Sequence, residues 1–184
     1  MLLQAAFLAC FVGSSQVEIK FEAVSQGFRA GEMALFRAIA VNRGRVPIYL
    51  VPQSDGMHSG RRSPVVQVQI RNVGGDWIVP TLSGCGNTDP LRAESFVLVK
   101  PGKSSDLLAG MEWSKHEVAS AIKEPGVYEA RLVYDTTAPF ADWLGGPMSE
   151  PKQAELSLKL KPLYALVPKF KYTSPAVRFR VTAN

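Results

Sequence analysis

The stretch that decides the fold is Glu124-Pro125-Gly126-Val127-Tyr128-Glu129-Ala130-Arg131-Leu132-Val133-Tyr134-Asp135. A Pro-Gly pair, typical of a turn, leads directly into a run of alternating residues. In an extended chain, alternate side chains point to the same face. One face carries Tyr128, Ala130, Leu132 and Tyr134, and the other carries Glu129, Arg131, Val133 and Asp135. The pattern predicts a half-buried antiparallel strand.

Further runs of this kind surround it. Strands are predicted at residues 17–23, 33–42, 46–51, 66–70 paired with 77–79, 95–99 and 104–108. The 33–42 run is apolar on both faces, which indicates a central strand. Many short strands with turn residues between them favour an all-β antiparallel sandwich over alternating strands and helices.

The two sides of the 124–135 strand differ. Before it, residues 113–122 are predicted to form one short helix, because Ser114 and Glu117 have the spacing of a capping box. After it, residues 136–175 look irregular. Two alternating segments, 155–161 and 176–182, compete to be the last core strand.

Chain length, composition and charge limit the kind of protein that this sequence can encode. The chain has 184 residues, 46% of them hydrophobic and 20% charged, which suits one globular domain. The formal net charge is +5, but the basic residues are scattered along the chain. Alternating pairs such as Lys159/Lys161 and Arg178/Arg180 are typical of the solvent faces of strands. No nucleic-acid partner is expected.

The first 15 residues resemble a secretory signal peptide. Residues 1–12 carry no charge, and small and polar residues follow at 13–16. The apolar run is too short for a membrane span, which needs about 20 residues. Phe7-Leu8-Ala9-Cys10 also resembles a lipoprotein signal that ends before a lipidated Cys10. The alternative is a buried N-terminal strand or helix. We expect residues 16–184 to form one extracytoplasmic domain, at a membrane only if Cys10 is lipidated.

Three stretches resemble bacterial extracytoplasmic immunoglobulin-like domains. They are Gly31-Glu32 before the apolar strand and Pro47-Ile48-Tyr49-Leu50, then Phe96 to Val99 before Pro101-Gly102, and lastly Pro125-Gly126-Val127-Tyr128. The last resembles a tyrosine corner, in which a tyrosine hydroxyl bonds to backbone just upstream. The resemblance implies an immunoglobulin-like β-sandwich with Tyr128 as its structural corner. Ala130 stands where antibody domains carry cysteine, so it also implies a sandwich without a disulfide.

Few residues suggest chemistry. The chain has two histidines, His58 and His116, without the paired spacing of metal ligands. Cys85 lies between glycines, as in tight turns, and thiol catalysis would need a base within hydrogen-bond reach. We therefore expect no enzyme, no cofactor and no metal. A thiol enzyme or metal carrier using Cys85 with His58 or His116 is one alternative.

The remaining candidate site is aromatic. Phe140, Trp143, Tyr164 and Tyr172 follow the deciding strand and could form a binding patch, since aromatic residues anchor interfaces. They could instead cover the open end of the core, and this reading is favoured because large apolar residues are usually buried.

The sequence thus predicts a non-enzymatic, exported binding or structural protein of the bacterial cell envelope. Its partner would be another envelope or secreted protein. A further alternative is a peptidase-inhibitor-like module acting through the 53–64 loop.

Overall fold

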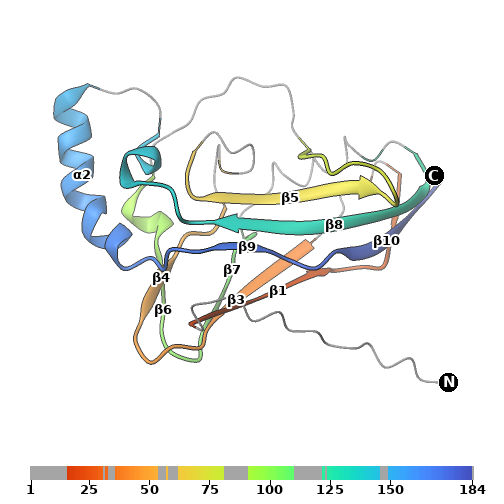
Figure 1. The fold of residues 1–184 in the computed structure, drawn as a ribbon, viewed down its shortest axis with the longest axis horizontal. Coiled ribbons are helices and arrows are strands. Elements are labelled where there is room, and N and C mark those ends of the chain that lie inside the picture. The colour runs from red at the N-terminus through yellow and green to blue at the C-terminus, as the bar shows by residue number, and fades with distance from the viewer. Residues whose placement is uncertain are drawn as a thin grey trace.

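The computed structural model describes residues 16–30, 32, 36–53, 57, 62–80, 91–109, 122, 124–145 and 149–183. In this part of the chain most regular structure is strand, in antiparallel and mixed sheets, with one α-helix (Figure 1). The prediction of a mainly β protein is confirmed at this level.

One sheet has three strands in the order β1-β3-β7. They are β1 (Val17–Ala23), β3 (Phe36–Asn42) and β7 (Ser104–Asp106), and both pairings are antiparallel. All three lie within predicted strand segments. β3 is central, as expected. Its Ala38, Ala40 and Asn42 are fully buried, whereas Ile39 and Val41 on the other face are only half-buried.

The second sheet has five strands. Its path is β2 (Gly27–Arg29), β10 (Val177–Thr182), β8 (Gly126–Asp135) and β5 (Val65–Asn72), and β9 (Lys171–Thr173) also pairs with β8. β2 is parallel to β10, and the other pairings are antiparallel. The last strand is therefore 177–182, one of the two predicted contenders.

The deciding stretch forms β8, with neighbours on both sides. Tyr128, Ala130, Leu132 and Tyr134 are buried on the inner face, as the alternation predicts. The outer face is less exposed than a half-buried strand implies, because Glu129 and Val133 are buried too. A central strand has its outer side chains flanked by those of two neighbouring strands, which reduces their contact with water.

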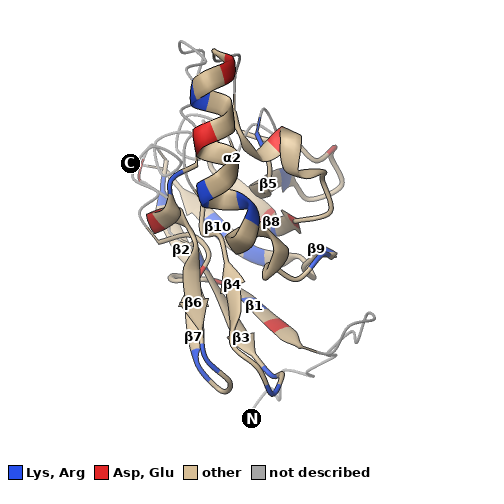
Figure 2. Ribbon diagram, turned by 90° about the vertical axis from the view of Figure 1, so that its left-hand side faces the viewer, with Lys and Arg blue, Asp and Glu red and all other residues tan. Residues whose placement is uncertain are grey.

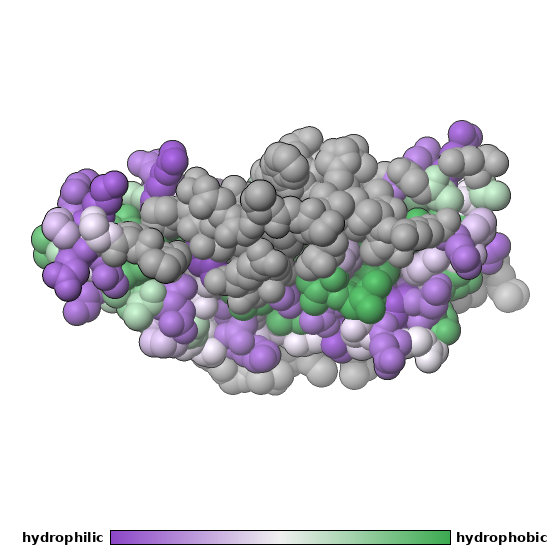
Figure 3. All heavy atoms as spheres, turned by 90° about the horizontal axis from the view of Figure 1, so that it is seen from above, coloured by the Kyte–Doolittle hydropathy of each residue, from purple (hydrophilic) through white to green (hydrophobic). Residues whose placement is uncertain are grey.

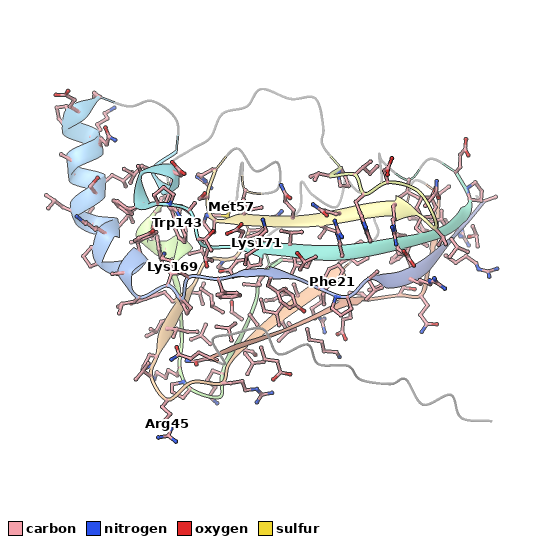
Figure 4. The ribbon with its side chains drawn as sticks, in the orientation of Figure 1. Phe21, Arg45, Met57, Trp143, Lys169 and Lys171 are labelled. Atoms are coloured by element: carbon pink, nitrogen blue, oxygen red, sulfur yellow. The ribbon has the colours of Figure 1, made fainter. Side chains whose placement is uncertain are left out.

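Aromatic side chains join the two sheets. Phe36 of β3 lies with its ring centroid 5.5 Å from that of Phe179 on β10, and 5.4 Å from that of Phe21 on β1. Phe179 also packs against Phe28 of β2, at 5.6 Å. Figure 4 shows Phe21 on the side of its strand that faces the larger sheet. The core thus lies between the two sheets.

Two smaller elements complete the strands. β4 (Ile48–Leu50) pairs with β6 (Val97–Val99), which follows the short helix η1 (Ala93–Ser95). The predicted hairpin of 66–70 with 77–79 is reduced to one bridge between Ile70 and Ile78 on the free edge of β5. Gly74, with φ of 87°, lies in the turn between them.

β9 and β10 lie along the same side of β8, separated by a bulge. Val133 is paired with Thr173 but Ala130 with Val177, so the β9–β10 side has one extra residue. Pro175 has no N–H to contribute there. The Leu132 N–H instead donates to the Ser174 hydroxyl at 2.9 Å. The Ser174 side chain thus replaces a missing rung of the sheet.

The predicted strand at 155–161 is wrong. These residues belong to α2 (Glu150–Ala165), and the short helix η2 (Phe140–Trp143) precedes it, so 136–175 is not simply irregular. The alternating leucines imitate a strand, but Leu156 and Leu160 are also four residues apart and share a helix face. Glu, Gln, Leu, Lys and Ala favour helix, and a proline in the first turn suits its start.

The helix follows β8 in the chain, whereas the sequence predicted one before it. That predicted helix, 113–122, lies outside the described residues except for Ile122, which is buried. α2 stands at one end of the sheets rather than across a face (Figure 1).

Candidate binding surface

The outer face of the five-stranded sheet gathers charged side chains. On β10, Arg178 and Arg180 are exposed while Phe179 and Val181 are buried. Cationic side chains at six strand positions lie on this face: Arg29, Arg71, Arg131, Lys171, Arg178 and Arg180. The same strands carry two carboxylates there, Glu129 and Asp135. The face therefore has a net charge of +4, against +5 for the whole chain.

Glu129 is at the centre of one row across three strands. The sheet register places it opposite both Arg71 and Arg178. Arg178 Nε donates to Glu129 Oε1 at 2.9 Å, and Arg71 approaches Oε2 through Nε at 2.9 Å and through its terminal nitrogen at 2.7 Å. The Glu129 side chain is only 7% exposed. Hydrogen bonds from Arg178 and then Arg71 hold the pKa of Glu129 below its ordinary value.

Trp77 lies against two of the arginines. Its ring centroid is 4.4 Å from the Arg71 guanidinium carbon and 4.2 Å from that of Arg131. The bridge between Ile70 and Ile78 sets this position, because it places Trp77 beside Arg71 at the edge of β5. Cations over the face of an indole ring are attracted to its π-electrons.

Arg131 differs from its neighbours in charge balance. Its Nε donates to the neutral Gln69 Oε1 at 2.8 Å. Within the described residues it makes no ion pair, whereas Arg71 and Arg178 share Glu129. Burial, and then the nearby charge of Arg71, lower the pKa of Arg131. The half-buried guanidinium is thus positioned by Trp77 and Gln69 with its positive charge uncompensated.

Three of the four residues of the predicted aromatic patch come together. The Tyr164 ring centroid lies 5.1 Å from that of Phe140 and 4.9 Å from that of Trp143. Trp143 is fully buried and also packs on Phe96, at 6.2 Å. Tyr172 is elsewhere, on β9, where its hydroxyl donates to the Ile19 carbonyl at 3.0 Å. The cluster closes the end of the core and fixes α2 to it.

Lys169 covers the outside of this cluster. Its Nζ lies 3.2 Å from the Tyr164 ring centroid and 4.4 Å from that of Trp143, and donates to the Tyr164 carbonyl at 3.2 Å. Figure 4 shows Lys169 beside Trp143 at the end of the molecule near α2. Burial lowers the pKa of the ammonium to about 8, while attraction to the two rings acts in the opposite sense.

Tyr128, predicted to be a structural corner, makes a hydrogen bond of the kind expected at a tyrosine corner. Its hydroxyl donates to the Glu124 carbonyl, four residues upstream, at 2.8 Å. Ala130, which the resemblance places where antibody domains carry cysteine, is fully buried against the core.

The other predicted site residues cannot be placed. Cys10, His58, Cys85 and His116, with the 1–15 segment, lie outside the described residues. Of the 53–64 loop, Gln53, Met57, Arg62, Ser63 and Pro64 are described and all are buried, and the rest of this predicted inhibitory loop lies outside the described residues. The described part of the chain holds no cluster of three or more metal-ligating side chains. It also has no helix long and apolar enough to cross a membrane.

Sequence reasoning missed the arginine face, the outer face of the five-stranded sheet that carries Arg29, Arg71, Arg131, Lys171, Arg178 and Arg180. The alternation did predict that Arg131 and Arg178 point outward, but it could not show that five strands bring their charges together. Trp77 gave no signal beyond the predicted hairpin, which placed it near β5.

Comparison with known proteins identifies no relative. No protein-family model matches the chain, and no match emerges among curated proteins or solved structures.

Proposed function

We propose that this chain is a non-enzymatic binding domain with an immunoglobulin-like fold, which binds an acidic protein through the outer face of its five-stranded sheet. In such sandwiches, strands A, B and E share one sheet with D, and strands C, F and G form the other. The order β1-β3-β7 corresponds to A, B and E, and the adjacent strands β5, β8 and β10 correspond to C, F and G. A counterpart of D is missing among the described strands.

The tyrosine corner agrees with this assignment. Tyr128 lies near the start of β8, which takes the place of strand F, where tyrosine corners occur. Fold alone implies no activity, so the function must be argued from the surface.

The carrying observation is the uncompensated charge of the arginine face. Six cations share this face with two carboxylates, and Arg131 is held half-buried with no acidic partner among the described residues. A desolvated charge is unfavourable unless an opposite charge approaches it. Arginines held by an aromatic ring are also frequent anchors of protein interfaces. An acidic protein surface would supply the missing carboxylates.

Export is the second part of the proposal. The 1–15 segment, with an uncharged apolar run over residues 1–12 followed by small and polar residues, supports a signal peptide, and the partner is then another envelope or secreted protein.

The test uses poly-L-glutamate as a defined acidic polypeptide. We expect the full chain to bind it by calorimetry, with affinity that falls as salt rises. The double variant Arg131→Gln/Arg180→Gln leaves the Glu129 row intact and should weaken binding about tenfold or more.

The matched control is Lys100→Gln/Lys103→Gln. It removes the same net charge from exposed residues around the turn between β6 and β7, and should change affinity by less than about twofold. Equal losses in the two variants would reduce the effect to net charge alone and refute the site. Absence of binding, or preferential binding of a DNA oligonucleotide through Arg131, would also refute an acidic protein partner.

A further inference from the structure

α2 is apolar on two opposite faces. Leu160 is buried, and Leu156, Leu163 and Tyr164 are packed against the core, so these residues form the inner face. A helix of a globular protein usually has one such face, with polar residues opposite.

The second face contains exposed apolar residues at helical spacings, Pro151, Ala154, Leu158, Pro162 and Ala165, continued by Leu166 directly after the helix, and the charged Glu155 lies among them. Residues at these spacings lie on the same side of a helix. Leu158 is 79% exposed and Leu166 is 56% exposed. Figure 3 shows hydrophobic residues among hydrophilic ones at the end of the molecule that α2 occupies. Single exposed leucines are ordinary, but an aligned apolar face indicates a partner.

Few contacts with the rest of the chain stabilise α2. All side chains from Glu150 to Glu155 are exposed, and Leu160 is the one buried residue of α2. An isolated helix of this length is marginal in water. Packing a second surface against α2 would stabilise it.

Charge along α2 indicates what that surface is. The first half carries Glu150, Lys152 and Glu155, and the second half carries Lys159 and Lys161. Glu155 and Lys159 form an exposed ion pair within the helix, with Nζ 2.7 Å from Oε1. Figure 2 shows the acidic residues of α2 toward its upper end, with a basic residue between them, and basic residues alone toward its lower end. The halves have net charges of −1 and +2. An antiparallel copy of α2 places each half beside its opposite, and also opposes the helix dipoles.

We propose that α2 pairs with α2 of a second copy of this chain, antiparallel and about a twofold axis at Leu158. In this arrangement Leu158 meets Leu158 of the second copy, Ala154 faces Pro162, and Pro151 faces Ala165. A twofold interface uses the same surface on both chains, so the face must be complementary to itself, and this one is. The small residues on either side of Leu158 allow the backbones to approach closely.

The first experiment measures self-association by sedimentation over a wide range of protein concentrations. We expect a monomer–dimer equilibrium that Leu158→Glu weakens at least about tenfold, because two carboxylates would meet at the axis. The control is Leu98→Glu, at another exposed leucine, which lies on β6 and is 49% exposed, and it should leave the equilibrium unchanged. Ala154→Glu serves as a second variant, with circular dichroism to verify folding of both.

The second experiment determines direction. A photo-crosslinking residue, p-benzoylphenylalanine, replaces Ala154, and the crosslinked tryptic peptides are identified by mass spectrometry. Antiparallel pairing predicts attachment to the peptide that contains Pro162 of the second copy, and attachment to the peptide around Ala154 would instead indicate parallel pairing.

Three results would overturn the proposal: a monomer at every concentration, equal association of wild type and Leu158→Glu, or parallel crosslinks. Binding of monomers to anionic phospholipid vesicles through Leu158 would assign the face to a membrane surface instead.

Discussion

Tyr128, which the sequence singled out as a structural corner, makes a specific hydrogen bond. Its hydroxyl donates to the Glu124 carbonyl at 2.8 Å, and the ring stacks on Phe179 with centroids 5.8 Å apart. We expect Tyr128→Phe to keep the ring contact but lower the free energy of unfolding by about 1 kcal/mol, through loss of one hydrogen bond. Urea denaturation measures the change. Tyr49→Phe, whose hydroxyl has no hydrogen bond within the described residues, should leave stability unchanged.

Ser174 supports the bulge between β9 and β10. Ser174→Ala removes the acceptor of the buried Leu132 N–H and should cost about 1–3 kcal/mol, the penalty for an unsatisfied buried donor. Ser104→Ala, at an exposed strand position, should change stability by less than about 0.5 kcal/mol. If the two variants unfold at the same urea concentration, Ser174 does not complete the sheet.

Glu129 should make the free energy of unfolding depend on pH in the acidic range. Its pKa is lowered in the folded state, so its contribution is present at neutral pH and is lost as the pH falls through the folded-state pKa, below the usual carboxyl value of about 4.3. We expect the stability of the wild type to fall more steeply toward low pH than that of Glu129→Gln. Glu94→Gln, an exposed carboxylate, is the matched control and should follow the wild type. Identical pH profiles for wild type and Glu129→Gln would contradict this role.

Among the elements, strands followed from the sequence and α2 did not. The period-2 pattern of β8 was decisive because Tyr128, Leu132 and Tyr134 all face one core. Residues 155–161 show the same pattern, but Leu158 is exposed whereas Leu160 is buried. The alternating leucines therefore do not share one buried face, as they would in a strand. Alternation predicts a strand only where a neighbouring strand is available to pair with it, and pairing partners are not visible in a local pattern.

α2 should also be the least stable described element. Its first half has exposed side chains throughout, whereas β8 is buried between two strands. We expect amide hydrogens of residues 153–157 to exchange much faster than those of β8, measured by mass spectrometry at low protein concentration, where pairing of α2 is weakest. Protection of these amides should rise with concentration if α2 self-associates. Protection equal to that of β8 at low concentration would show that α2 is already fixed within one chain.

On the scale of the whole molecule, the sequence predicted the class of fold better than the site. Turn residues and alternation are local, and they located most strands. The arginine face depends on the order β2-β10-β8-β5, which brings Arg71, Glu129 and Arg178 into one row from positions far apart in the chain. The aromatic patch was predicted from composition, and it includes a buried Trp143 because aromatic residues close cores as readily as they form interfaces.

Phe179 tests whether the two sheets form one cooperative unit. It contacts Phe28, Phe36 and Tyr128, from both sheets, and is only 2% exposed. Phe179→Ala should lower the free energy of unfolding by about 3–5 kcal/mol and accelerate hydrogen exchange in β1, β3, β8 and β10 together. Leu160→Ala, which also creates a buried cavity but beside α2, should accelerate exchange chiefly in that helix. If Phe179→Ala accelerates exchange in β10 alone, the sheets unfold separately, and the hydrogen bond from Tyr128 to Glu124 then stabilises one sheet rather than the whole molecule.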